Sequence, residues 1–352
     1  MTGDGGWATP PEGAYPTTSP VARTVELAER HQIAIYLLAL AGAVAIGVRA
    51  PGTGPTLEHA IEPVLASLLY ATFLQVPFTA LTRSFRDGRF LVAVLGVNFV
   101  VVPVVVWALT LGLPDDRAVV LGVLLVLLTP CIDYVIVFAG LAGGSAQRLL
   151  AAAPLLMLAQ LVLLPVYLLL FLGSDLATIV EPGPFLRAFI VLIAIPLALA
   201  AATEALAKRH RVGRWVTRFM TGLMVPLMAA TLFVVVASQV PEVRDSLGTV
   251  ARVLPVYIAF PVIMAFVGRL AARAARLDVP AGRALTFSGA TRNSLVVLPL
   301  ALALPPQYAI AAVVVVSQTL VELITMVIYV RLIPWLQPEP PDQPETADGA
   351  GG

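Results

Sequence analysis

Long apolar runs separated by short polar stretches fill most of the chain. A helix needs about 20 apolar residues to cross a bilayer, and runs of this length recur between residues 31 and 333. They predict ten transmembrane segments, over 31–49, 60–81, 90–113, 119–140, 149–173, 185–207, 219–238, 250–271, 285–304 and 308–333. The pattern therefore predicts an all-α integral membrane protein.

Two of these runs, the fourth and the ninth, contain residues that a membrane helix disfavours. The fourth is interrupted at Thr129–Asp133, and the ninth at Ser288–Ser294. Proline removes a backbone donor, and a charge at the bilayer centre costs about 2.5–3.5 kcal/mol. We expect broken, crossing helices, with breaks at Pro130 and Gly289. Their freed backbone groups should line a cavity, because lipid offers them no partners.

The loop 174–184 divides the ten segments into two halves, 31–173 and 185–333. Because five is an odd number, two related halves would have opposite orientations, which is the inverted repeat of many secondary transporters. The two interruptions fall in corresponding segments of these halves. We predict two inverted five-helix repeats between an N-terminal tail, 1–30, and a disordered C-terminal tail, 334–352.

Composition and charge exclude several classes of protein. Hydrophobic residues make up 59% of the chain and charged residues 12%, whereas a soluble domain has about 25% charged residues. The net charge of +1 argues against nucleic acid as a partner, and the single cysteine excludes a disulfide. Basic residues concentrate in alternate connections, including a loop at 208–218, which predicts a multi-pass plasma-membrane protein with both termini in the cytosol.

Three ionisable residues lie deep in the predicted spans: Asp133, Arg292 and Glu322. Their charges sum to −1, so one proton would neutralise the site, although a bound cation would also do so. Arginine stays charged, so we expect Arg292 to hold one of the carboxylates ionised. Asp133 and Glu322 are the candidates for carrying the coupled proton. The alternative is a fixed ion triad, but charges inside a membrane usually mark a substrate or proton path.

Glu322 belongs to a polar stripe on the last apolar run. Gln318, Glu322 and Thr325 are spaced i, i+4 and i+7, which places them on one face of a helix. We expect this face to point into the helix bundle. Hydrogen bonds between helices would explain Gln318 and Thr325, but they do not explain a carboxylate.

Cys131 is the only cysteine and follows Pro130 in the first interruption. A lone buried cysteine is often a small apolar residue, but a thiol also binds soft, thiophilic solutes, so both roles stay open. Together with Glu322, we assign Thr129 and Asn293, which lie in the two interruptions, to substrate binding. The sequence has no phosphate loop, histidine metal motif or nucleophile elbow, so no enzyme activity, cofactor or metal site is predicted.

The Thr-Pro-Cys motif, the interruption Ser288–Ser294 and Glu322 in Val-Glu-Leu-Ile resemble the arsenical-resistance permeases. These are arsenite carriers within the bile acid/sodium symporter superfamily. The resemblance implies a core domain of segments three to five and eight to ten. It also implies a panel domain of segments one, two, six and seven. It makes Cys131 and Glu322 the residues tied to metalloid transport.

The chain also departs from these relatives. Larger residues, Ile132 to Tyr134, follow the Pro-Cys motif where small ones are expected. Sodium-coupled symporters carry a glutamate and then Gln-Asn in segment nine. Here Ser288 stands in place of the glutamate and Arg292 in place of the glutamine, with Asn293 kept. An arginine in a sodium site should expel sodium, which favours proton coupling.

The predicted function is the efflux of neutral metalloids, arsenite or antimonite, coupled to proton antiport. The alternative is a sodium- or proton-coupled symporter of small organic anions of the bile-acid or keto-acid type, with Arg292 binding the carboxylate. Either reading names a small solute, a coupling ion and the lipid bilayer as partners, with sodium the less favoured ion. An intramembrane enzyme or sensor is disfavoured.

Overall fold

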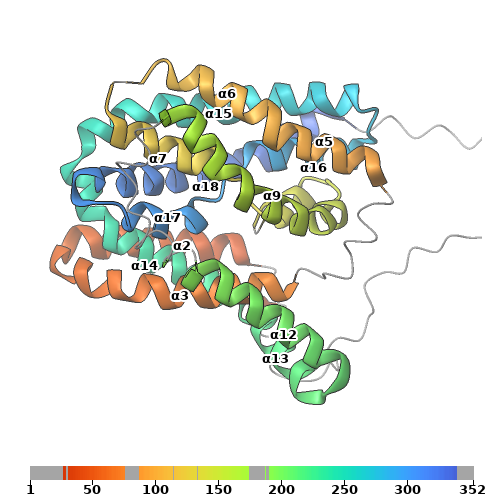
Figure 1. Ribbon diagram of the computed structural model, residues 1–352, viewed down its shortest axis with the longest axis horizontal. Coiled ribbons are helices and arrows are strands. Elements are labelled where there is room, and N and C mark those ends of the chain that lie inside the picture. Colours follow the sequence, from red (N-terminus) through yellow and green to blue (C-terminus); the bar gives the residue numbers. More distant parts are fainter. Residues whose placement is uncertain are drawn as a thin grey trace, which may run out of the picture.

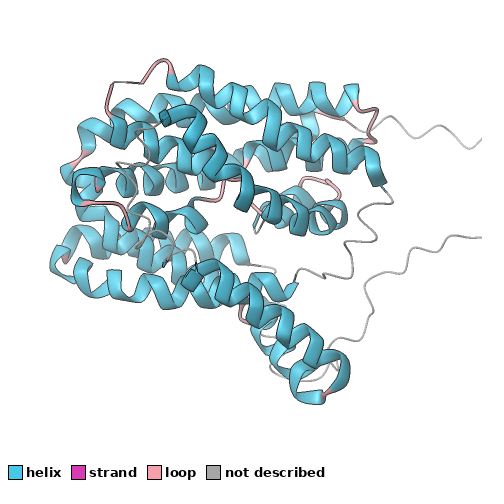
Figure 2. Ribbon diagram, viewed as in Figure 1, coloured by secondary structure: helices cyan, strands magenta, loops and turns pink. Residues whose placement is uncertain are grey.

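The computed structural model describes residues 27–28, 31–75, 87–113, 115–132, 134–173, 187 and 190–338. These residues form helices and connecting loops, without a strand (Figure 2), so the all-α prediction is confirmed. Five described helices are long and apolar enough to cross a membrane. They are Gly88–Thr110, Ala146–Leu172, Met224–Pro241, Leu247–Ala274 and Ile310–Leu336.

Two predicted segments of the first half consist of more than one helical element. The helices are α2 (Gln32–Arg49), α3 (Gly54–Gln75), α5 (Gly88–Gly96), the π-helical turn η4 (Val97–Val101), α6 (Val102–Thr110), α7 (Arg117–Leu127), α8 (Tyr134–Leu141) and α9 (Ala146–Leu172). The elements α5, η4 and α6 follow one another without a gap, whereas α7 and α8 are separated by the first predicted interruption.

The second half has a corresponding broken helix near its end. Its helices are η6 (Ile190–Ala194), α12 (Ile195–Arg209), α13 (Arg211–Gly222), α14 (Met224–Asp245), α15 (Leu247–Ala274), α16 (Val279–Ala290), α17 (Ser294–Leu302) and α18 (Ile310–Leu336). Each predicted segment overlaps one or more described helices. The count of ten spans and the inverted repeat remain predictions.

Local chemistry fixes where several helices begin. Asp116 accepts hydrogen bonds from the amides of Ala118 and Val119, at 3.0 and 3.3 Å. Asp278 caps α16 in the same way, with its Oδ1 2.8 Å from the amide of Ala281. Short polar side chains satisfy the free N–H groups at a helix start, so these carboxylates mark the starts of α7 and α16.

The helices pack as two groups (Figure 1). In one group α14 packs against α2 and α3, and α12 packs against α3 and α13. In the other, α18 contacts α7, α15 and α17, while α16 contacts α8 and α15. The groups meet where α14 contacts α18 and where α3 contacts α17. The first group contains the predicted segments one, two, six and seven, and the division into panel and core domains stays a prediction.

Two predicted boundaries differ from the structure. The stretch 208–218 is not a loop, because residues from Arg211 onward form α13; its apolar and basic residues recur at helical spacing. The last helix does not end before Pro334 but continues to Leu336, because proline lacks only its own N–H and removes one i→i−4 hydrogen bond, the one to the carbonyl of Val330. Of the predicted tails, residues 1–26, 29–30 and 339–352 lie outside the described residues.

Candidate transport site

The two helix breaks cross and pair with each other through their backbones. The amide of Cys131 donates to the carbonyl of Thr291 at 3.1 Å, and the amide of Asn293 donates to the carbonyl of Thr129 at 2.9 Å. Pro130 and Arg292 thereby form an antiparallel bridge. Each break thus supplies the partners that the other lacks, as buried backbone groups require. The expectation that the two interruptions meet is confirmed.

The second break is shorter than the sequence indicates. Helix α16 continues to Ala290 and α17 begins at Ser294, so only Thr291 to Asn293 leave the helix. Gly289 is therefore not the break, which begins two residues later. A Cβ atom at Gly289 would lie 2.9 Å from the Val97 side chain, so this glycine allows close packing instead. Pro130 does lie in the first break.

The guanidinium of Arg292 sits where two helices end. Arg292 is 0% exposed. Its Nη2 donates to three oxygens and its Nη1 to one: Asn98 Oδ1 at 2.8 Å, Ser288 O at 2.7 Å, Gly289 O at 2.8 Å and Leu127 O at 3.3 Å. The last carbonyls of a helix carry partial negative charge. Arg292 thus caps the C-terminal ends of both α7 and α16.

Arg292 and Glu322 lie close enough for their charges to interact, and the expectation that Arg292 holds a carboxylate ionised stays a prediction. Glu322 accepts from the backbone amide of Arg292, at 2.9 Å, and no ion pair joins their side chains among the described residues. The guanidinium is held by helix ends because Glu322 approaches from the backbone side of the break. Asp133 lies outside the described residues, so its role stays a prediction.

Glu322 is nevertheless surrounded by donors. Its Oε1 accepts from the hydroxyl of Tyr134, and its Oε2 accepts from the amide group of Gln318 as well as from the amide of Arg292. Glu322 is 3% exposed. A buried carboxylate requires such compensation, because an unpaired charge in a medium of low polarity is costly.

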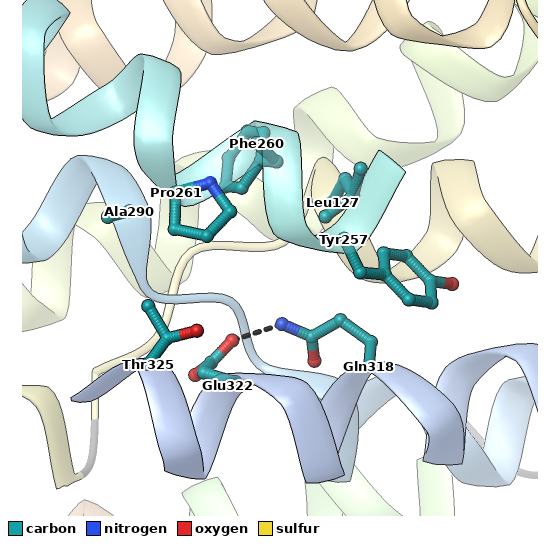
Figure 3. Close-up of a pocket in the computed structure, with 8 residues that line it drawn as sticks. All are labelled: Leu127, Tyr257, Phe260, Pro261, Ala290, Gln318, Glu322 and Thr325. Atoms are coloured by element: carbon teal, nitrogen blue, oxygen red, sulfur yellow. Dashed lines mark hydrogen bonds between the residues drawn. The ribbon is translucent and has the colours of Figure 1, made fainter. Parts of the chain in front are cut away.

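Gln318, Glu322 and Thr325 line one small cavity, together with residues from the ends of α7 and α16 and from α15 (Figure 3). The predicted polar stripe therefore does point into the bundle. The cavity measures about 10 Å³, which is room for about one water molecule. Gln318 is 5% exposed, and its Oε1 has no hydrogen-bond partner among the described residues.

The other predicted binding residues are buried beside this cavity without lining it. The Thr129 hydroxyl donates to Leu125 O at 2.8 Å, and the Asn293 side chain caps α17 by accepting from the Val296 amide at 3.2 Å. Cys131 is fully buried. The part of Cys131 in substrate binding stays a prediction.

A larger cavity is lined by residues of both groups of helices. Its volume is about 450 Å³. Glu58 and Gln239, which form a hydrogen bond of 3.0 Å, line it from α3 and α14. Residues of α17 and α18 line the opposite wall. Because residues of both groups line this cavity, a movement of one group against the other would change the access of solvent to it.

Two residues of the site escaped the sequence reasoning. Asn98 binds Arg292 from the π-helical turn and also donates to the Ser288 hydroxyl at 3.0 Å. Its polar side chain lies within the third apolar run, 90–113, and this could have identified Asn98 as a candidate site residue. Tyr134, the donor to Glu322, directly follows the first break, but a tyrosine there reads equally well as packing.

The model of the sodium bile acid symporter family matches residues 62–246, more than half of the 352-residue chain. The chain belongs to the sodium bile acid symporter family. Members of this family transport small solutes across membranes, and with the long apolar helices this makes the protein a membrane transporter. The match includes the first break but ends before Arg292. No curated protein matches the chain.

Proposed function

We propose that this member of the sodium bile acid symporter family exports a small neutral metalloid of the arsenite or antimonite type in exchange for protons. The observation that carries the proposal is the place of Arg292. A fixed positive charge already occupies the crossing of α7 and α16, and Glu322 lies next to it as a buried carboxylate.

The coupling ion follows from this charge. Carbonyls at helix ends are typical ligands of a bound cation, but here four oxygens already accept from the Arg292 guanidinium. A sodium ion at the same place would meet a like charge at close range, which is unfavourable in a medium of low polarity. Glu322 is the one buried carboxylate of the described residues, so we assign the coupled proton to it.

The substrate class follows from the groups around the crossing. A thiol selects soft, thiophilic solutes in a way that carbonyls and carboxylates do not, and Cys131 is bonded through its backbone to the residue before Arg292. The Oε1 of Gln318, which has no partner among the described residues, would accept a hydroxyl donor, and a neutral trihydroxy metalloid has three. Gln318 donates to Glu322, which accepts from the amide of Arg292, so this group and the thiol both belong to the crossing region.

The alternative of organic-anion symport is less well supported. It requires the Arg292 fork to bind a carboxylate, and a bidentate contact uses two N–H groups of the guanidinium. Both Nη atoms donate to protein oxygens, and only Nε lacks a partner among the described residues. A carboxylate would have to displace the contacts that close the ends of α7 and α16.

For the arrangement in the membrane, we propose ten spans in two inverted repeats with both termini in the cytosol. Alternating access would move the group of α2, α3, α12 and α14 against the group that holds the crossing. Proton and metalloid would compete for the region around Glu322, and this competition produces antiport.

The test is arsenite transport in vesicles with an imposed pH gradient. Cys131→Ser removes the soft ligand and Glu322→Gln removes the proton site, so each should lower gradient-driven transport by about tenfold or more. Glu204→Gln is the matched control, since Glu204 forms a helix-surface pair with Lys208 at 3.3 Å. If Cys131→Ser and Glu322→Gln both transport at the normal rate, the mechanism is wrong.

A further inference from the structure

Helix α13 carries an exposed aromatic ridge that nothing in the transport site uses. Trp215 is 64% exposed and Phe219 is 52% exposed. Their rings stack with centroids 5.3 Å apart and planes 8° apart. Val212 extends the same ridge and is also exposed. Large apolar side chains that gather on a surface mark a contact with another molecule or with a membrane.

A basic ridge runs beside the aromatic one. Arg211, Arg214 and Arg218 are all exposed. At 100° per residue, positions 211, 214 and 218 fall on one strip of a helix, and 212, 215 and 219 fall on the neighbouring strip. No carboxylate of the described residues forms an ion pair with Arg211 or Arg218. The two guanidinium groups are therefore available to an outside anion.

The remaining face of α13 fixes the helix to the protein. Gly213 is buried, and a Cβ atom there would clash with the backbone nitrogen of Ala207. The Nη1 of Arg214 donates to the carbonyl of Ala207 at 3.2 Å. Because Gly213 packs against α12, the aromatic ridge points away from α12, together with Arg211 and Arg218 on the outer side of the basic ridge. Figure 1 shows α12 and α13 projecting together from the helix bundle.

The neighbours of α13 in the chain set its level in the membrane. His210 alone separates it from α12, and Leu223 alone separates it from α14, which contains a membrane-span candidate, Met224–Pro241. A helix so closely tied to a span lies near the bilayer surface. Tryptophan is enriched at that level because its ring has an apolar body and a polar edge.

We propose that α13 lies in the membrane–water interface and binds the phosphate groups of anionic phospholipids. Arg211 and Arg218 contact the headgroups, and Trp215 and Phe219 insert beneath them. Helices with a basic strip beside an aromatic strip bind anionic bilayers in this way. An acidic cytosolic protein would satisfy the arginines but would leave the stacked rings unexplained next to a membrane. The inference is independent of the transported solute.

The experiment uses Trp215 as the reporter. Phenylalanine replaces the other three tryptophans, Trp7, Trp107 and Trp335. The full chain is then reconstituted in mixed bilayers of phosphatidylcholine and phosphatidylglycerol. In each sample only one of the two lipids carries brominated acyl chains. Bromine quenches a tryptophan that reaches the acyl region. Brominated phosphatidylglycerol should quench Trp215 more strongly than brominated phosphatidylcholine does, by about fivefold or more. Each arginine near an anionic surface strengthens binding to that surface about fivefold.

In the same background, Arg211→Gln/Arg218→Gln should reduce this preference to about one, and Arg211→Lys/Arg218→Lys should largely keep it. The matched control is Arg273→Gln/Arg276→Gln, which removes two exposed arginines at the end of α15 and should leave the preference unchanged. The proposal is overturned if neither lipid quenches Trp215, if both quench it equally, or if the control pair matters as much as Arg211 and Arg218.

Discussion

The two ends of α16 solve the same electrostatic problem in different surroundings. At its N-terminal end Asp278 accepts from the Ala281 amide, so a negative side chain meets the positive end of the helix. At its C-terminal end Arg292 donates to Ser288 O and Gly289 O, so a positive side chain meets the negative end. Each residue caps the helix with the charge that the dipole favours.

The difference between the two caps is burial. The Asp278 side chain is 52% exposed and is paired with Arg148, whose Nη1 lies 2.6 Å from Oδ1. Arg292 is fully buried, and the four acceptors of its guanidinium are neutral oxygens. Water can replace a lost partner at Asp278 but not at Arg292. The buried cap should therefore dominate both stability and ion selectivity.

The largest effect is expected for Arg292→Met. The methionine side chain fills the space of the aliphatic part of the arginine, but Ser288 O, Gly289 O and the other two acceptors lose their hydrogen-bond donor. A buried polar group without a partner costs about 1–3 kcal/mol, so the loss should reach about 3–5 kcal/mol, as when one member of a buried pair is removed. Thermal unfolding of the purified protein in detergent measures it.

Sodium provides the control for this variant. Without the guanidinium, the four oxygens around it resemble a site for a hard cation, which prefers oxygen ligands. Sodium chloride, compared with choline chloride, should raise the unfolding temperature of Arg292→Met and leave the wild type unchanged. Equal stabilisation of both proteins by sodium would contradict the proton-coupled account.

An intermediate effect is expected for Tyr134→Phe. The hydroxyl of Tyr134 donates to Glu322, and a hydrogen bond to a charged group contributes about 1.5–3 kcal/mol. Tyr329→Phe is the matched comparison, since Tyr329 is buried and its hydroxyl donates to the neutral carbonyl of Pro261. Tyr134→Phe should also weaken proton-driven transport, whereas Tyr329→Phe should affect stability alone. Equal transport loss in both would remove Tyr134 from the site.

The smallest effect is expected at the exposed end of α16. Partial burial raises the pKa of Asp278, but the Arg148 hydrogen bond, the Ala281 amide and the Arg148 charge together hold that pKa below its ordinary value. The folded pKa lies below the unfolded one, so the ionised side chain stabilises the protein above about pH 4. That stabilisation disappears as the pH falls through the folded pKa.

Asp278→Asn should remove this acid-sensitive part, which is at most about 1 kcal/mol for an exposed pair, and keep the helix cap, because asparagine caps equally well. The measurement is the unfolding temperature between pH 7 and pH 3. The difference in unfolding temperature between the wild type and Asp278→Asn should become smaller as the pH falls. A difference that stays constant with pH would show that Asp278 acts only as a cap.

The sequence predicted the membrane class, the approximate helices and the meeting of the two breaks. It did so because apolar length and mid-membrane proline leave few structural solutions. It did not predict the neutral oxygens that accept from the Arg292 guanidinium, since charge counting gives no information about carbonyls at the ends of helices. Asn98 and Tyr134 were missed for the same reason, because their importance depends on which distant residues the crossing brings near.

The central claim is that protons, and not sodium ions, exchange with the solute at Glu322. The direct measurement is the internal pH of sodium-free vesicles containing the purified protein and a trapped pH dye, after an arsenite gradient is imposed without a pH gradient. The account predicts that arsenite movement drives protons the opposite way, and that Glu322→Gln abolishes this pH change. Arsenite movement without a pH change, or movement that requires sodium, would contradict it.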